Sequence, residues 1–133
     1  MRSRSRRPEN VQPASSETRA TYEMTFPGPI RGYVTRTRRG LWANKRSREY
    51  YAYKQLFRLA ANAAGFPAEL DGERRNILGV VASWKKKRRI DGSNVVKAVE
   101  DALFGQDRRL DGLEYRDLEH HGEEAVHVAL RIY

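Results

Sequence analysis

Apolar residues follow the spacing of β-strands in several stretches of the chain. Residues 22–26 and 126–132 alternate apolar and polar side chains, which places every second residue on the same side of a sheet. Residues 77–84 form a nearly continuous apolar run, which predicts a buried strand. A further short strand is expected over 115–119. The pattern therefore predicts a sheet that draws most of its strands from the second half of the chain.

Two other stretches repeat apolar residues at helical spacing. The first covers residues 47–64, ends at Gly65, and places on one face Tyr50, Tyr53, Phe57, Ala60, Ala61 and Ala64. The second covers residues 94–104, and its expected core face contains Val95, Ala98, Val99, Ala102 and Leu103. Both stretches are long enough for amphipathic helices that cover a sheet.

The segment between the first strand and the first helix is basic and extended. Residues 30–37 and 41–44 flank a turn at 38–40, which indicates a hairpin or loop. The expected order is β-β-α-β-α-β-β, an α+β fold with one mixed sheet and two main helices. Residues 1–20 contain almost no apolar side chains, so we expect a disordered basic tail before a single domain over 21–133.

The composition narrows the classes of protein that fit. The chain has 133 residues and no cysteine, which excludes disulfide frameworks, thiolate nucleophiles and thiolate zinc sites. No stretch approaches the roughly 20 apolar residues that a membrane-spanning helix needs. We expect a soluble, cytoplasmic protein without a membrane partner.

The charge of the chain indicates a polyanionic partner. Lysine and arginine total 26 against 17 acidic residues, a net charge of +9. Nucleic acid is the favoured partner, and a basic protein without such a partner is the alternative. An RNA-binding module is a weaker third possibility. The expected phosphate contacts outside the 85–89 run are Arg36, Arg38, Arg39, Lys45, Arg46 and Arg48.

A run of five cations at 85–89 leads directly into Asp91, and Lys97 and Asp111 follow. The run consists of Lys85, Lys86, Lys87, Arg88 and Arg89. Cations attract phosphate, and carboxylates beside that phosphate can hold Mg²⁺, which prefers oxygen ligands. Lys97 would then stabilise charge on the phosphate or the leaving oxygen. The alternative is a set of ordinary surface charges around a turn and a helix start.

The spacing of these residues resembles a diagnostic stretch of the RusA family of phage and prophage Holliday-junction endonucleases, which act in DNA recombination and repair. The matching residues are Arg88, Arg89, Asp91, Asn94, Lys97, Asp101, Leu103 and Asp111. The strand ending at 26–27, the basic segment 31–39 and the tyrosine-rich helix occur in the family's order. The resemblance covers about residues 21–133.

The resemblance implies a RusA-like fold and a homodimer that cuts four-way DNA junctions with Mg²⁺. Asp91 and Asp111 would bind the metal, Lys97 would be the catalytic lysine, and Asn94 would contribute to DNA binding. Ser93 and Gly112 stand where the family has aspartates. Two hypotheses follow: a Mg²⁺-dependent junction endonuclease, and a RusA-fold protein that binds DNA without cutting it, as a regulator or architectural factor.

Overall fold

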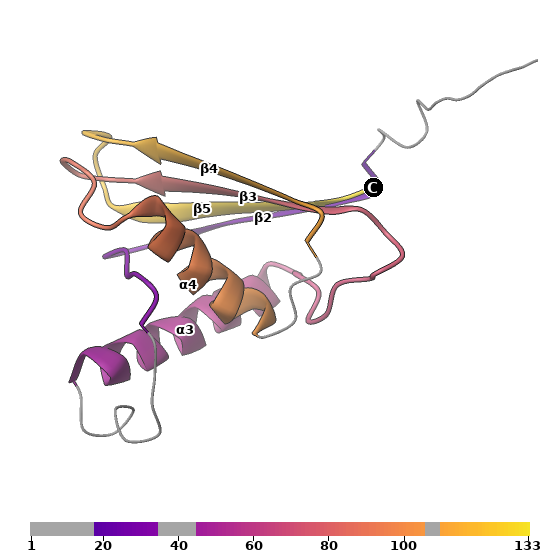
Figure 1. Cartoon of the computed structure of the whole chain (residues 1–133), viewed down its shortest axis with the longest axis horizontal. Coiled ribbons are helices and arrows are strands. Elements are labelled where there is room, and N and C mark those ends of the chain that lie inside the picture. The colour runs from indigo at the N-terminus through magenta and orange to yellow at the C-terminus, as the bar shows by residue number, and fades with distance from the viewer. Residues whose placement is uncertain (1–17, 35–44, 106–109) are drawn as a thin grey trace, which may run out of the picture.

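The computed structural model describes residues 18–34, 45–105 and 110–133. The described chain forms, in order, β2 (Ala20–Pro27), α3 (Lys45–Ala63), β3 (Asn76–Ser83), α4 (Gly92–Phe104), β4 (Gly112–Leu118) and β5 (Ala125–Ile132). The strands make one sheet in the order β2-β5-β3-β4 (Figure 1). The expected α+β class, with one mixed sheet and two helices, is confirmed.

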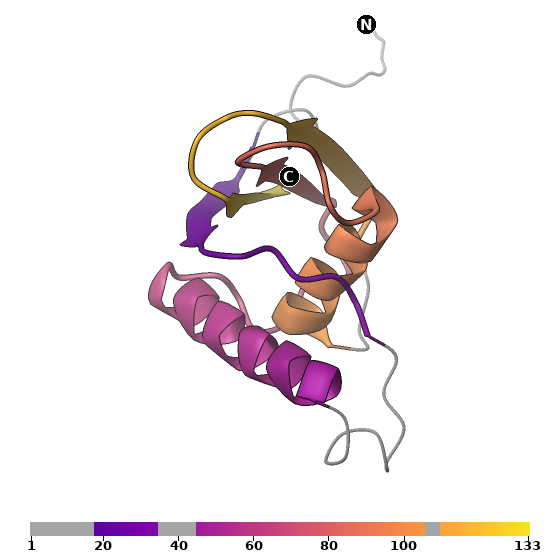
Figure 2. The ribbon, with the colours of Figure 1, turned by 90° about the vertical axis from the view of Figure 1, so that its left-hand side faces the viewer.

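The sheet combines antiparallel and parallel pairing. β5 lies antiparallel between β2 and β3, whereas β3 and β4 run parallel. Parallel neighbours cannot be joined by a tight hairpin, and α4 provides the crossover between them. Both helices cover the same face of the sheet (Figures 1 and 2). The chain therefore leaves the end of β3 through a loop that leads directly to the start of α4.

The core lies between this sheet face and the two helices. Alternate residues of β3 point into it, and Phe57 of α3 is 0% exposed at its centre. The predicted core face of α4 is buried throughout: Val95, Ala98, Val99, Ala102 and Leu103. Trp84 directly follows β3 and is 0% exposed, so the apolar run ends in the core. Periodicity alone identified these buried positions correctly.

The expected order of elements contained one strand too many for the described chain. The described elements follow the order β-α-β-α-β-β. Residues 30–34, which we call the strap, form no strand pairing. The backbone N–H of Tyr33 donates to the carbonyl oxygen of Asn94 (3.0 Å), so the strap is fixed to α4 instead of to a strand. The other part of the predicted hairpin, residues 35–44, lies outside the described residues.

The first described strand begins close to the predicted start of the domain. Most of the predicted tail, residues 1–17, lies outside the described residues. Regular structure begins one residue earlier than position 21, because Ala20 pairs with Ile132 and Arg19 N–H donates to the carbonyl oxygen of Ile132 (2.7 Å). Among the described helices, neither is long and apolar enough to cross a bilayer.

Candidate nucleic-acid interface

The basic run leaves the sheet at the end of β3 and is held by the turn between β4 and β5. The N–H groups of His120 and His121 donate to the carbonyl oxygens of Lys86 and Trp84, each at 2.9 Å. These backbone bonds leave all five cationic side chains of the basic loop, residues 85–89, exposed. The basic loop is thus a fixed platform for cations.

The cations of the basic loop surround a shallow hollow of about 630 Å³, the basic hollow. Its lining consists of Lys85, Lys86, Lys87, Arg88, Arg89, His120 and Glu124. Five cations and one carboxylate, that of Glu124, line this hollow, so its lining carries a net positive charge. Such a surface suits the phosphates of a nucleic acid backbone.

A second group of predicted phosphate contacts lies close to the basic loop. Arg46, in the first turn of α3, and Arg89 line the same small hollow of about 220 Å³, together with Arg31 of the strap. Lys45 and Arg48 lie beside Arg46 and are exposed. Three other predicted contacts, Arg36, Arg38 and Arg39, lie outside the described residues. Segments far apart in the sequence therefore present cations at one end of the molecule.

A separate hollow of about 400 Å³, the α4–β4 hollow, lies between the start of α4 and the edge strand β4. It is lined by Arg88, Asp91, Gly92, Ser93, Val96, Lys97, Glu100, Leu113, Tyr115 and Asp117. Arg88 lines this hollow as well as the basic hollow. The two hollows therefore share a rim at Arg88.

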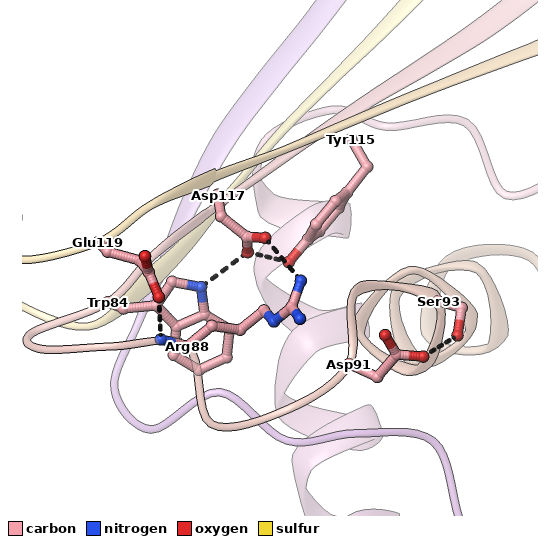
Figure 3. Close-up of polar contacts among 7 residues, drawn as sticks. All are labelled: Trp84, Arg88, Asp91, Ser93, Tyr115, Asp117 and Glu119. Atoms are coloured by element: carbon pink, nitrogen blue, oxygen red, sulfur yellow. Dashed lines mark hydrogen bonds and ion pairs between the residues drawn. The ribbon is translucent and has the colours of Figure 1, made fainter.

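Asp117 organises this rim (Figure 3). Its Oδ1 accepts hydrogen bonds from Trp84 Nε1 (2.8 Å) and the Tyr115 hydroxyl (2.5 Å). Its Oδ2 lies 3.3 Å from Arg88 Nη1. Burial opposes ionisation, but the donors from Tyr115, Trp84 and Arg88 outweigh it and lower the pKa of Asp117 below its ordinary value. The carboxylate is therefore an ionised anchor for one arginine.

The Tyr115 ring packs tightly against the first residue of α4. Desolvation, together with the hydrogen bond that the Tyr115 hydroxyl donates to the Asp117 carboxylate, raises the pKa of Tyr115 well above its ordinary value. The hydroxyl is therefore a hydrogen-bond donor at neutral pH. The close approach requires a glycine at position 92, because a Cβ there would lie 2.7 Å from Tyr115 Cε2.

Gly92→Ala is expected to lower the free energy of unfolding by about 1–3 kcal/mol, the usual cost of overpacking. The ring of Tyr115 cannot move away from the new Cβ without disturbing its hydrogen bond to Asp117. Urea denaturation measures the loss. Gly79→Ala is the matched control, since a Cβ at position 79 meets nothing closer than 3.8 Å. An equal loss in both variants would contradict this explanation.

Three of the predicted site residues surround the start of α4. The carbonyl oxygen of Asp91 accepts from the N–H of Asn94 (2.9 Å), and its Oδ2 accepts from Ser93 Oγ (2.6 Å) (Figure 3). Asp91 and Lys97 both line the α4–β4 hollow. Asn94 is exposed, and its carbonyl oxygen holds the strap through Tyr33.

The structure does not bring Asp111 to this hollow. Asp111 Oδ2 accepts from the backbone N–H of Asn76 (2.7 Å), the first residue of β3, whereas Asp91 lies beyond the last residue of β3. The two aspartates that the resemblance pairs thus lie toward opposite ends of one strand. Asp101 is also engaged elsewhere, because its Oδ2 accepts from Tyr50 and Lys54 of α3.

The residues of the α4–β4 hollow do not fit the magnesium site that the resemblance implies. Within the described ranges, no three histidine or acidic side chains form a group suited to a metal ion. Of the three acidic residues that line the hollow, Asp117 is engaged by three donors and Asp91 by Ser93, and Glu100 is not among the residues that the resemblance pairs with Asp91. Mg²⁺ needs carboxylate oxygens that are free to enter its shell. We therefore derive no chemical step through Mg²⁺.

Sequence reasoning missed the acidic residues that hold the basic loop. Asp117 anchors Arg88, Glu119 Oε2 accepts from the backbone N–H of Arg88 (2.6 Å), and Glu124 pairs with Arg89. Tyr115 and Asp117 lie two residues apart within the predicted strand 115–119, so they share a face. A carboxylate on the same strand face as an apolar ring was the sequence feature that could have identified Asp117 as a partly buried hydrogen-bonding residue.

The chain matches no protein-family model and no curated protein. Its function is therefore inferred from the residues of the two hollows and from their placement at one end of the sheet.

Proposed function

We propose that this chain is a RusA-like DNA-binding protein that contacts phosphates through the basic loop and binds DNA without cutting it. The observation that carries the proposal is the exposure of all five cations of the basic loop around one hollow. Arg46 and Arg31 extend this surface toward α3. Cations fixed on a rigid platform lose less conformational freedom on binding than cations on a flexible segment.

The net charge of +9 supports a nucleic-acid partner over a small anionic ligand. The exposed cations extend from the basic loop to the first turn of α3, which suits a repeating phosphate backbone. Contacts of this kind release counterions, so affinity falls steeply as salt rises. This surface does not distinguish one base sequence from another, because backbone contacts position a protein without reading bases.

Binding without cutting is favoured over endonuclease activity because Asp111, one of the two metal-binding aspartates that the resemblance implies, lies away from the α4–β4 hollow. Asp111 lies near Asn76, and Ser93 and Gly112 occupy positions that are aspartate in the RusA family. The second candidate is a Mg²⁺-dependent Holliday-junction endonuclease. One observation favours it: Asp91 and Lys97, two residues of the family pattern, line the same hollow.

Nicking of a labelled synthetic four-way junction separates the two candidates. We expect the protein to bind the junction or a matched linear duplex, and to leave both uncut with Mg²⁺ and with Mn²⁺. Asp91→Asn should then bind as the wild type does. Metal-dependent symmetric nicks that disappear in Asp91→Asn would overturn the non-cutting proposal and establish the endonuclease. Failure to bind either DNA at 50 mM salt would overturn both.

Two further parts of the proposal concern the oligomeric state, which the resemblance implies, and the location, which the composition favours. We propose that the protein acts as a homodimer, which would place two basic loops on one DNA molecule, and that it acts in the cytoplasm. Sedimentation velocity on the free protein is expected to give twice the chain mass of 15.4 kDa. A single species at the chain mass across the micromolar range would exclude a dimer that forms without DNA.

A further inference from the structure

The five cations of the basic loop are exposed to solvent but differ in how they are held. Two of them have acidic partners: Arg88 pairs with Asp117, and Arg89 pairs with Glu124 and lies 5.6 Å over the ring of Trp84. Glu124 Oε2 also accepts from the backbone N–H of Ile30 (2.5 Å), which ties the strap to the loop. The arginines are thus positioned side chains within an otherwise lysine-rich loop.

We propose that Asp117 is a positioning residue that aims the guanidinium of Arg88 at the rim shared by the two hollows, where Arg88 binds a DNA phosphate. This inference rests on the proposed function and assigns one contact within it. It gives Asp117, a carboxylate near a polyanion site, a role that increases DNA affinity.

The contacts of Asp117 give it this role. The indole of Trp84, which is 0% exposed, and the hydroxyl of Tyr115 hold its Oδ1 from the interior. Its Oδ2 is thereby directed toward Arg88 Nη1. The side chain of Asp117 is 23% exposed and that of Arg88 is 46% exposed. The carboxylate is therefore on the protein side of the pair, and the guanidinium is on the solvent side.

A guanidinium in this position suits a phosphate. It carries five N–H donors in a planar fork, so contact through Nη1 with Asp117 is compatible with donation to phosphate oxygens from its other edge. The backbone N–H of Arg88 is held by Glu119, which fixes the start of the side chain as Asp117 fixes its end. An arginine held at both ends loses little conformational freedom when it binds.

The direction in which DNA affinity changes on removing a carboxylate separates a positioning role from simple electrostatic repulsion. Removing any carboxylate near a DNA site should raise affinity by simple electrostatics, so Glu123→Gln, on the exposed turn beside the loop, is expected to bind duplex DNA slightly more tightly. We expect Asp117→Asn to bind more weakly, by about two- to fivefold, because Arg88 is no longer held. Fluorescence anisotropy on one duplex between 50 and 200 mM salt measures both.

A double-mutant cycle tests whether Asp117 changes DNA affinity through Arg88. Arg88→Ala is expected to weaken binding about fivefold at 0.15 M salt and to reduce the salt slope by about one, the value for one phosphate contact. Asp117→Asn in the Arg88→Ala background should cause no further loss. A merely structural role for Asp117 would leave the salt slope unchanged in the single variant. Tighter binding by Asp117→Asn, or additive losses, would overturn the inference.

Arg88→Lys keeps the test decisive if Asp117→Asn does not fold. Arg88 is exposed, so this variant should fold, and it retains the charge but loses the planar fork. We expect it to bind more weakly than the wild type, whereas equal affinity would refute a positioned guanidinium. If the wild type binds neither the duplex nor the four-way junction, the proposed function fails. The site is then tested with inorganic phosphate, followed by NMR at the Arg88 Nε–H signal, and a signal that does not move overturns the inference.

Discussion

Phe57→Ala is expected to lower the free energy of unfolding by about 3–5 kcal/mol, the usual cost of truncating a buried aromatic side chain. Phe57 is 0% exposed and joins α3 to the sheet. Its ring lies 4.8 Å from that of Phe26 on β2 and 5.8 Å from that of Tyr53. Truncation removes these contacts and leaves a cavity that the packed helices cannot fill. Urea denaturation followed by circular dichroism measures the loss.

Leu59→Ala is the matched control for Phe57→Ala. Leu59 lies on the same helix two residues later and is 63% exposed, so truncation there creates no cavity. We expect a change within about 0.5 kcal/mol, as for most surface substitutions. A loss at Leu59 as large as that at Phe57 would show that the outer face of α3 is also covered in solution, and the described core would be incomplete.

Replacing Lys85, Lys86 and Lys87 together with alanine is expected to weaken duplex binding about 100-fold at 0.15 M salt. Each phosphate contact contributes a salt slope of about 0.9, so three lost contacts should reduce the slope by nearly three. The three lysines are exposed and line the basic hollow, so the substitutions should leave the fold intact. Anisotropy titrations at several salt concentrations measure affinity and slope on the same samples.

A second triple variant controls for net charge. Arg19, Arg74 and Arg75 lie where β2 and β3 begin, at the other end of the sheet from the basic loop (Figure 1). Changing these three to alanine removes the same charge but no proposed phosphate contact. We expect less than a tenth of the affinity loss seen with the lysine variant. Equal losses in the two variants would mean that DNA is attracted by total charge alone and would refute the basic loop as the binding surface.

Local patterning was sufficient to predict the elements. The helices α3 and α4 and the strands β3 and β5 follow from apolar periodicity, which depends only on which residues must face a core. The structure departs from the expected element order at residues 30–34, which form no strand pairing and whose backbone is bound at Tyr33 by Asn94 of α4. A backbone hydrogen bond to a helix far along the chain cannot be predicted from the local spacing of apolar residues.

The chemistry of the candidate site depended more on distant contacts. The resemblance to the RusA family implied a single cluster of Asp91, Lys97 and Asp111, but the crossover through α4 carries Asp111 back to the level of Asn76. Spacing along a chain does not report which end of a parallel strand a residue occupies. Only the pairing of β3 with β4 separates Asp111 from the other two residues.

The sequence by itself determined the α+β class, the core faces of both helices and the concentration of cations before Asp91. These are properties of composition and of local periodicity, which each segment carries independently. Only the tertiary structure decided which cations share a surface and which carboxylates hold them. Asp117 lies beside Trp84 because the register pairs Ser83 with Leu118, a contact between strands 35 residues apart. Such contacts depend on strand order and register, which the pattern of apolar residues leaves open.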